Sequence, residues 1–268
     1  MNFKYLLNVI LTIPLLPILY YQGKKIRTNI PKLPEAKGIE GLVFKKSNTT
    51  LRLITLGDSS MAGVGVNTHK AGFVGTLAEE LGLYYNINIA WKVYAKSGFT
   101  ALKVKERLIP NIQEDVLNLI VIGVGGNDAF KLTSPKKWID NVKMLIAELR
   151  VRYKNQPIVF INMPPVREIP AFSLLIKYVM GNLLDFYSDE LVALTKSMDG
   201  VFYCSSKIMY KDYIKRYNLN SHSSEFFSEG DKFHASKLAY QIWAKDIANF
   251  ITENKNIKNR MIDNEYGT

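Results

Sequence analysis

Short runs of apolar residues alternate with longer stretches of mixed polarity over most of the chain. The apolar runs are rich in β-branched residues and several are closed by glycine or proline, which is typical of buried strands in a parallel sheet. They occupy residues 53–57, 87–95, 117–122, 158–161 and 201–204. We therefore predict five buried strands in this order along the chain.

Between and after these runs, apolar residues recur with the spacing of one helix face. The predicted helices cover about residues 71–83, 100–109, 135–149, 171–196 and 235–251. Ser134 and Pro135 suit the N-cap and first position of the third helix. Strands that alternate with helices predict an α/β fold, with a parallel sheet covered on both faces. Right-handed crossovers then bring four loops to one edge of that sheet, at residues 57–59, 97–100, 125–128 and 164–167.

The N-terminal apolar run, residues 5–21, carries no charge and has tyrosines at both ends. As a helix it would be about 25 Å long, which is near the lower limit for crossing a bilayer. We interpret it as an uncleaved membrane anchor. A cleaved signal peptide and a core or interfacial helix are the alternatives, but no small-residue cleavage site follows the run. Pro14 and Pro17 would kink a helix here and leave open a segment that enters the membrane without crossing it.

Basic residues are more frequent after this run than before it. Lys4 precedes it, whereas Lys24, Lys25, Arg27, Lys32 and Lys37 follow it. By the positive-inside rule the following domain faces the cytoplasm, with a periplasmic or secreted domain as the alternative. The polar stretch after the run is punctuated by proline and glycine, which is typical of a linker. The predicted organisation is a hydrophobic anchor segment at 1–22, a linker at 23–50, one folded domain at 51–252 and a polar tail at 253–268.

Composition narrows the class of protein. Hydrophobic residues at 47% and charged residues at 22% match a globular protein with a buried core. The formal net charge of +11 favours anionic partners, and we expect a membrane surface rather than nucleic acid because no nucleic-acid module accompanies the charge. Cys204 is the single cysteine, so no intrachain disulfide can form, and we expect no metal site.

Gly57, Asp58 and Ser59 close the first predicted strand. In open α/β sheets ligands bind at the carboxyl ends of the strands, so Ser59 is a candidate nucleophile. A simple turn is the alternative, because all three residue types are common in turns.

A serine nucleophile needs a base, and the chain has three histidines. His69 lies in a turn after the glycine-rich loop, and His222 lies in a polar loop. His234 stands at the start of the last predicted helix, three residues after Asp231, and at this spacing both side chains can project from one turn. An ordinary helix cap beside a surface histidine is the alternative.

The oxyanion of the transition state needs preorganised donors. Asn127 offers a side-chain amide, Gly98 an unobstructed backbone N–H, and Ser59 its own N–H. Each of these residues could equally belong to a turn.

Together these blocks resemble the SGNH (GDSL-type) hydrolase family, over about residues 51–251. The blocks are Gly57-Asp58-Ser59, then Gly98, then Gly125-Gly126-Asn127-Asp128, then Asp231 and His234. The resemblance implies a three-layer α/β/α sandwich with a flavodoxin-like sheet. It also implies that Ser59 is the nucleophile, His234 the base and Asp231 the orienting acid, and that Ser59, Gly98 and Asn127 form the oxyanion hole. Ser60 stands where many members have leucine, beyond the nucleophile.

The activity implied is ester hydrolysis through an acyl-enzyme, without a cofactor. We expect a small-molecule or lipid ester as substrate. An O-acetyl-carbohydrate esterase or a thioesterase on the same fold remains open, as does a non-catalytic, membrane-tethered binding protein. The apolar stretch 166–195 begins at the catalytic edge. It is interpreted as a packed helix, with an acyl-chain wall or a membrane-facing cap as the functional alternative.

Overall fold

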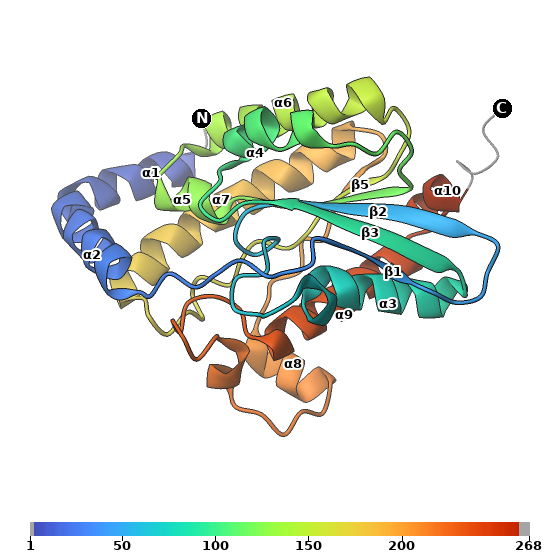
Figure 1. Cartoon of the computed structure of the whole chain (residues 1–268). Helices are drawn as coiled ribbons and strands as arrows, with labels where there is room; N and C mark the ends of the chain where they lie inside the picture. Colours follow the sequence, from blue (N-terminus) through green and yellow to red (C-terminus); the bar gives the residue numbers. More distant parts are fainter. Residues whose placement is uncertain (1–2, 263–268) are drawn as a thin grey trace.

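Six strands form one sheet with helices on both faces in the computed structural model, which describes residues 3–262 (Figure 1). The strands are β1 (Glu40–Val43), β2 (Thr50–Gly57), β3 (Asn88–Ala95), β4 (Leu119–Gly123), β5 (Ile158–Phe160) and β6 (Val201–Tyr203). Their order across the sheet is β1-β3-β2-β4-β5-β6, and every pair is parallel except β1 with β3. The predicted three-layer α/β/α fold is therefore confirmed.

The five parallel strands have the flavodoxin-like order, in which the chain reverses its direction across the sheet once. From β2 the chain continues to β3 on one side, and it then crosses back over β2 to reach β4. The connections after β2 and β4 diverge from this switch point, and in such sheets ligands bind there, at the carboxyl ends of the strands. Ser59 follows β2 and Asn127 follows β4, so both residues lie at the switch point.

Right-handed crossovers divide the helices between the two faces. On one face α3 (Phe73–Tyr85) packs against α9 (Lys237–Glu253). On the other face α6 (Pro135–Arg152) lies between α4 (Ala101–Arg107) and α7 (Leu174–Ser197) (Figure 1). The rings of Trp138 in α6 and Tyr187 in α7 stack with their centroids 4.4 Å apart.

Several helices begin directly after a residue whose side chain caps them. The Ser134 hydroxyl accepts from the backbone N–H of Lys137 at 3.4 Å, with Pro135 in the first turn, as predicted. Ser173 and Ser236 cap α7 and α9 in the same way. Such a cap contributes about 1 kcal/mol. The shorter helices are α5 (Gly126–Phe130), α8 (Tyr210–Arg216) and the 3-10 turns His69–Ala71, Ile109–Asn111 and Ser223–Phe226.

The interpretation of residues 23–50 as a linker is wrong in part. The N-terminal helix continues to Asn29, and β1 adds an antiparallel edge strand to the sheet. Between them, the N–H of Ala36 donates to the Ala62 carbonyl at 3.0 Å. The apolar pattern did not reveal β1 because this short edge strand exposes every second residue and buries none fully.

The polar tail predicted from residue 253 is also wrong in part. Helix α10 (Lys255–Ile262) follows α9, and it buries Ile257 and Met261. The side-chain amide of Asn118 donates to the Met261 carbonyl at 3.0 Å. Residues 263–268 of the predicted tail lie outside the described residues.

The N-terminal apolar run is helical but bent. It consists of α1 (Phe3–Thr12), a 3-10 turn (Ile13–Leu15) and α2 (Leu16–Asn29). Pro14 and Pro17 lie at the bend, because proline lacks the N–H that would continue the α-helical ladder. By length and composition alone, Tyr5–Ile26 could cross a membrane, a property that anchors and signal sequences share. The side of the membrane is not determined by it.

The packing of α10 generates a stability prediction. Ile257→Ala removes a side chain that is fully buried, and we expect it to lower the free energy of unfolding by about 2–4 kcal/mol. Lys255→Ala, at an exposed position of the same helix, is the matched control and should change it by less than about 0.5 kcal/mol. Urea unfolding followed by circular dichroism measures both. Equal effects of the two substitutions would show that α10 is not packed on the domain.

Candidate active site

Ser59 is placed by the close approach of the β2 and β4 backbones. The N–H of Asp58 donates to the Gly123 carbonyl at 3.1 Å. A Cβ atom on Gly57 would stand 2.2 Å from that carbonyl oxygen, so a larger residue does not fit there. Beyond Asp58 the chain turns, with the N–H of Val64 donating to the Ser59 carbonyl at 3.1 Å. Ser59 thus lies half-buried at the carboxyl end of the sheet, as predicted.

The carboxylate of Asp58 lies beneath this turn and connects the β2 and β4 loops. One oxygen accepts from the N–H of Ser60 at 3.0 Å, and the other accepts from the Asn127 amide at 3.4 Å. Burial raises the pKa of Asp58 to about 6, although the Ser60 hydrogen bond and the charge of His234 lower it. His234 therefore lies within electrostatic reach of the residue that precedes Ser59.

Asp231 and His234 form a tight pair in the loop before α9. Asp231 Oδ2 lies 2.5 Å from His234 Nδ1. Asp231 Oδ1 accepts the backbone N–H groups of Phe233 at 2.9 Å and of His234 at 3.0 Å. Burial raises the pKa of Asp231, but the hydrogen bonds from His234 and these N–H groups together lower it by more. The net shift of this pKa is therefore downward. The pair leaves His234 Nε2 free for another partner.

Contacts between two loops place the segment of His234 against the glycine-rich loop that follows Ser59. A Cβ on Gly65 would stand 2.3 Å from the carbonyl oxygen of Ala235, so the glycine-rich loop passes directly against the chain beside His234. The Tyr240 hydroxyl donates to the Val64 carbonyl at 2.9 Å. Over residues 3–262, no hydrogen bond joins Ser59 to His234 directly. Catalytic hydrogen bonds are often long before substrate binds.

The backbone N–H groups of Ser59 and Gly98 have no acceptor among the described residues. Gly98 has φ +81, and a Cβ there would meet no atom within 4 Å, so this turn borders open space. The Asn127 amide is engaged, since it donates to the Phe99 carbonyl at 3.1 Å as well as to Asp58. The structure thus brings the three candidate oxyanion donors to one edge, two of them unpaired.

Glu35 stabilises the turn at this edge of the sheet, and its role was not predicted from the sequence. Its carboxylate accepts from the N–H of Ser97 at 2.8 Å and pairs with Lys96 at 3.0 Å, which fixes the turn that carries Gly98. No local signal identified Glu35, because its role depends on a contact with a turn far along the chain.

The other two histidines have different surroundings. His69 is buried beside Gly63, and burial lowers its pKa to about 4. His222 caps the 3-10 turn at Ser223–Phe226. Within the described residues, no group of three or more metal-ligating side chains gathers at one point.

A cluster of three phenylalanine rings begins at the residue before His234. The ring of Phe233 lies edge-on to the His234 ring with centroids 4.5 Å apart. It also contacts Phe172 at 5.4 Å and Phe130 at 5.9 Å. Phe130 is 38% exposed, so this aromatic cluster reaches the surface beside the candidate base.

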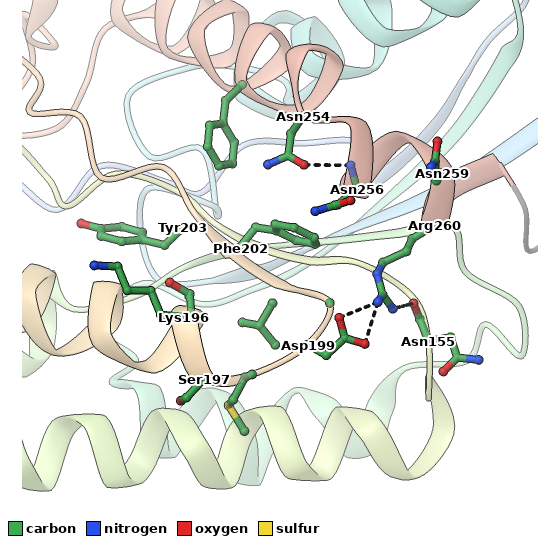
Figure 2. Close-up of a pocket in the computed structure, with 15 residues that line it drawn as sticks. Asn155, Lys196, Ser197, Asp199, Phe202, Tyr203, Asn254, Asn256, Asn259 and Arg260 are labelled. Atoms are coloured by element: carbon green, nitrogen blue, oxygen red, sulfur yellow. Dashed lines mark hydrogen bonds and ion pairs between the residues drawn. The ribbon is translucent and has the colours of Figure 1, made fainter.

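Two hollows lie apart from these residues. One, of about 970 Å³, follows the outer edge of β6 and ends at α10 (Figure 2). Asp199 there holds Arg260 through two contacts of 2.6 Å. The other, of about 250 Å³, lies between α1 and α7. Neither is lined by Ser59, Asp231 or His234, so neither is the candidate active site.

The fold defines the class: a three-layer α/β/α protein whose candidate site lies at the carboxyl edge of a flavodoxin-like sheet. The sequence profile of the GDSL-like lipase/acylhydrolase family matches residues 55–242, which is more than half of the chain. The chain belongs to this family, and the resemblance predicted from its sequence blocks is confirmed. Membership indicates an enzyme that hydrolyses esters.

Solved structures share the fold at low sequence identity. A GDSL-like lipase from Parabacteroides merdae has a TM-score of 0.58 at 15% identity, covering 75% of this chain and 94% of its own. A lipase/acylhydrolase from Enterococcus faecalis has a TM-score of 0.55 at 17% identity, covering 76% and 96%. A family 3 carbohydrate esterase from Clostridium thermocellum has a TM-score of 0.53 at 14% identity, covering 75% and 98%. Among curated proteins, none matches.

The raised pKa values at this edge generate a prediction for stability against pH. Asp128 is buried, and its pKa is raised to about 6, by burial first and also by the Asp58 charge. In the unfolded chain an aspartate titrates near about 3.9. Folding therefore takes up a proton between about pH 4 and pH 6, and this carboxylate lowers the free energy of unfolding as pH rises through that window.

Asp128→Asn removes this penalty and keeps an acceptor for the Ala101 N–H. Between pH 4.5 and pH 8 the parent loses this stability and the variant does not. The free energy of unfolding of the variant minus that of the parent should therefore be about 2 kcal/mol larger at pH 8 than at pH 4.5. Urea unfolding at the two pH values measures it, with the exposed Asp189→Asn as control. A difference independent of pH would show that Asp128 titrates alike in both states.

Proposed function

We propose that the protein is a serine esterase that cleaves carboxylic esters through an acyl-enzyme. Ser59 is the nucleophile, His234 the base and Asp231 the orienting acid. The observation that carries the proposal is the 2.5 Å contact between Asp231 and His234, in a loop packed against the glycine-rich turn that follows Ser59. A non-catalytic binding protein would have no use for a carboxylate that holds an imidazole in this way.

In this mechanism the Ser59 oxygen attacks the ester carbonyl carbon and its proton passes to His234 Nε2. The tetrahedral intermediate collapses, the bond to the alcohol oxygen breaks, and the alcohol leaves with that proton. Water, activated by His234 in the same manner, then releases the acid and restores Ser59. Asp231, whose pKa is lowered, stays ionised and stabilises the imidazolium that forms.

The unpaired N–H groups of Ser59 and Gly98 are suited to the oxyanion. Such donors each lower the barrier by about 3–4 kcal/mol when aimed at the developing charge. Asn127 joins them by exchanging its longer bond, the 3.4 Å contact with Asp58, for one to the oxyanion. Its bond to the Phe99 carbonyl keeps the amide in place during that exchange.

Ser59→Ala tests the assignment. We expect kcat for p-nitrophenyl butyrate to fall by about 10⁴-fold or more, because the acyl-enzyme can no longer form. Ser60→Ala is the matched control at the adjacent position and should retain the activity. Labelling of the full chain by a fluorophosphonate should be lost in Ser59→Ala and kept in Ser60→Ala. Unchanged hydrolysis and labelling in Ser59→Ala would overturn the assignment.

For the substrate we propose an ester with an apolar acyl group. The cluster of Phe130, Phe172 and Phe233 stands next to His234 and supplies an apolar wall there. The relative from Clostridium thermocellum is a carbohydrate esterase, so an O-acetylated sugar is the second candidate. An acetyl group would gain little from that wall.

A series of p-nitrophenyl esters separates the two candidates. We expect kcat/KM to rise from acetate to octanoate, and Phe130→Ala to lower the octanoate value by about tenfold while changing the acetate value by less than about threefold. Leu83→Ala, an exposed apolar truncation on α3, is the control and should change neither. A preference for acetate that Phe130→Ala leaves unchanged would support the O-acetylated sugar instead.

A further inference from the structure

The N-terminal segment has its polarity reversed for a helix packed on a protein in water. Two of its polar side chains face the domain: Asn8 accepts from Asn182 at 3.0 Å, and Gln22 accepts from Ser173 at 2.7 Å. Most of its apolar side chains between residues 6 and 21 are exposed, whereas Tyr5, Leu19 and Ile26 pack against the domain. Those exposed are Leu6, Leu7, Ile10, Leu11, Ile13, Leu16, Ile18, Tyr20 and Tyr21. A helix docked from water would bury the apolar face instead.

The segment contacts α7 near both of its own ends, and α1 and α2 form a bend at this edge of the molecule (Figure 1). The Tyr5 ring contacts Phe186 at 5.4 Å near one end, and Gln22 bonds Ser173 near the other. On α7 itself, Asp185 pairs with Arg167 and Lys207, so this helix belongs to the water-facing domain. While these contacts hold, both ends of the segment stay beside α7, which does not fit a straight helix that crosses the bilayer away from the domain.

The outward apolar surface continues onto the domain. Leu132 lines a hollow together with Ile13 and Leu16. Leu174, which is 85% exposed, follows the serine that bonds Gln22, and Tyr178 is exposed one turn further along α7. We call this surface the docking face: the exposed apolar side chains of residues 6–21 with Leu132, Leu174 and Tyr178. It reaches toward Phe130, and so toward the aromatic cluster beside His234.

We propose that the docking face rests on the surface of an anionic bilayer, with α1 and α2 lying flat between domain and lipid. Exposed apolar surface of this extent needs a cover, and Lys24 and Lys25, exposed on α2, match an anionic headgroup layer. The net charge of +11 acts in the same direction. The candidate site then borders the lipid, and its substrate is an ester of a bilayer amphiphile; this last step rests on the proposed function.

Vesicle flotation of the full chain tests the docking face outside the N-terminal segment. Leu174→Asp should weaken binding to phosphatidylcholine/phosphatidylglycerol vesicles by about tenfold or more. Val151→Asp also replaces an exposed apolar residue by aspartate, but on α6 and outside the docking face. It is the matched control and should bind as the parent does. Phosphatidylcholine vesicles alone should bind the parent more weakly. Equal binding of the two variants would overturn the proposal, as would failure of the parent to float.

Hydrolysis of p-nitrophenyl acetate in the same samples separates this proposal from the esterase. Leu174→Asp should hydrolyse this water-soluble ester at the parental rate, because Leu174 contacts none of the catalytic candidates. Loss of vesicle binding with retained acetate hydrolysis supports the docking face. A parent that floats but hydrolyses no ester would overturn the esterase and the substrate step, and would leave the docking face standing.

Fluorophore depth distinguishes a flat segment from a crossing one. Cys204 is the only cysteine and is buried, so single cysteines can be introduced in a Cys204→Ser background. Probes at positions 7, 13 and 18, all of which are exposed, report depth through lipids that carry quenchers at set positions. A flat segment gives equal, shallow depths at the three positions. A deepest probe at position 13 would mean that the segment crosses, and would overturn the flat arrangement.

Discussion

The contact between the ends of β2 and β4 is the constraint on which the candidate site depends. Without a Cβ on Gly57, the chain after β2 can lie against the Gly123 carbonyl. This contact draws Asp58 into the protein, where its carboxylate holds the Ser60 N–H and the Asn127 amide together. A single close approach of two backbones, at the switch point of the sheet, therefore positions both Ser59 after β2 and the Asn127 amide after the neighbouring strand β4.

This arrangement has an energetic cost. Burial raises the pKa values of both Asp58 and Asp128 to about 6, so at neutral pH the fold holds two carboxylates near one another in a poorly solvated place. Asp231 differs, because hydrogen bonds lower its pKa and keep it charged. The same residue type thus serves as a structural link in one case and as a charged partner of His234 in the other. Such shifted groups are concentrated where proteins bind or react.

The N-terminal segment carries most of the docking face, an exposed apolar surface that differs from the polar candidate site. Asn8 and Gln22 bond to Asn182 and Ser173, and most of the apolar side chains between residues 6 and 21 are exposed. The aromatic cluster beside His234 continues toward the same side of the molecule. On this view the apolar residues of α7 serve two purposes, since the inner ones pack the core and the outer ones extend an apolar surface beside the site.

By itself the sequence determined the five parallel strands, the main helices and the order of the blocks that identify the family. These features are local: the period of apolar residues specifies an element, and apolar residues of α3 such as Phe73 and Leu81 are buried. The three-residue spacing of Asp231 and His234 likewise allowed their contact to be predicted. Only the tertiary structure decided the place of β1 at the sheet edge, the packing of α10, the support of the Gly98 turn by Glu35 and the engagement of the Asn127 amide. It also decided which face of the N-terminal segment meets the domain. Each of these depends on a partner far away in the chain, and no periodicity or local motif encodes such a partner.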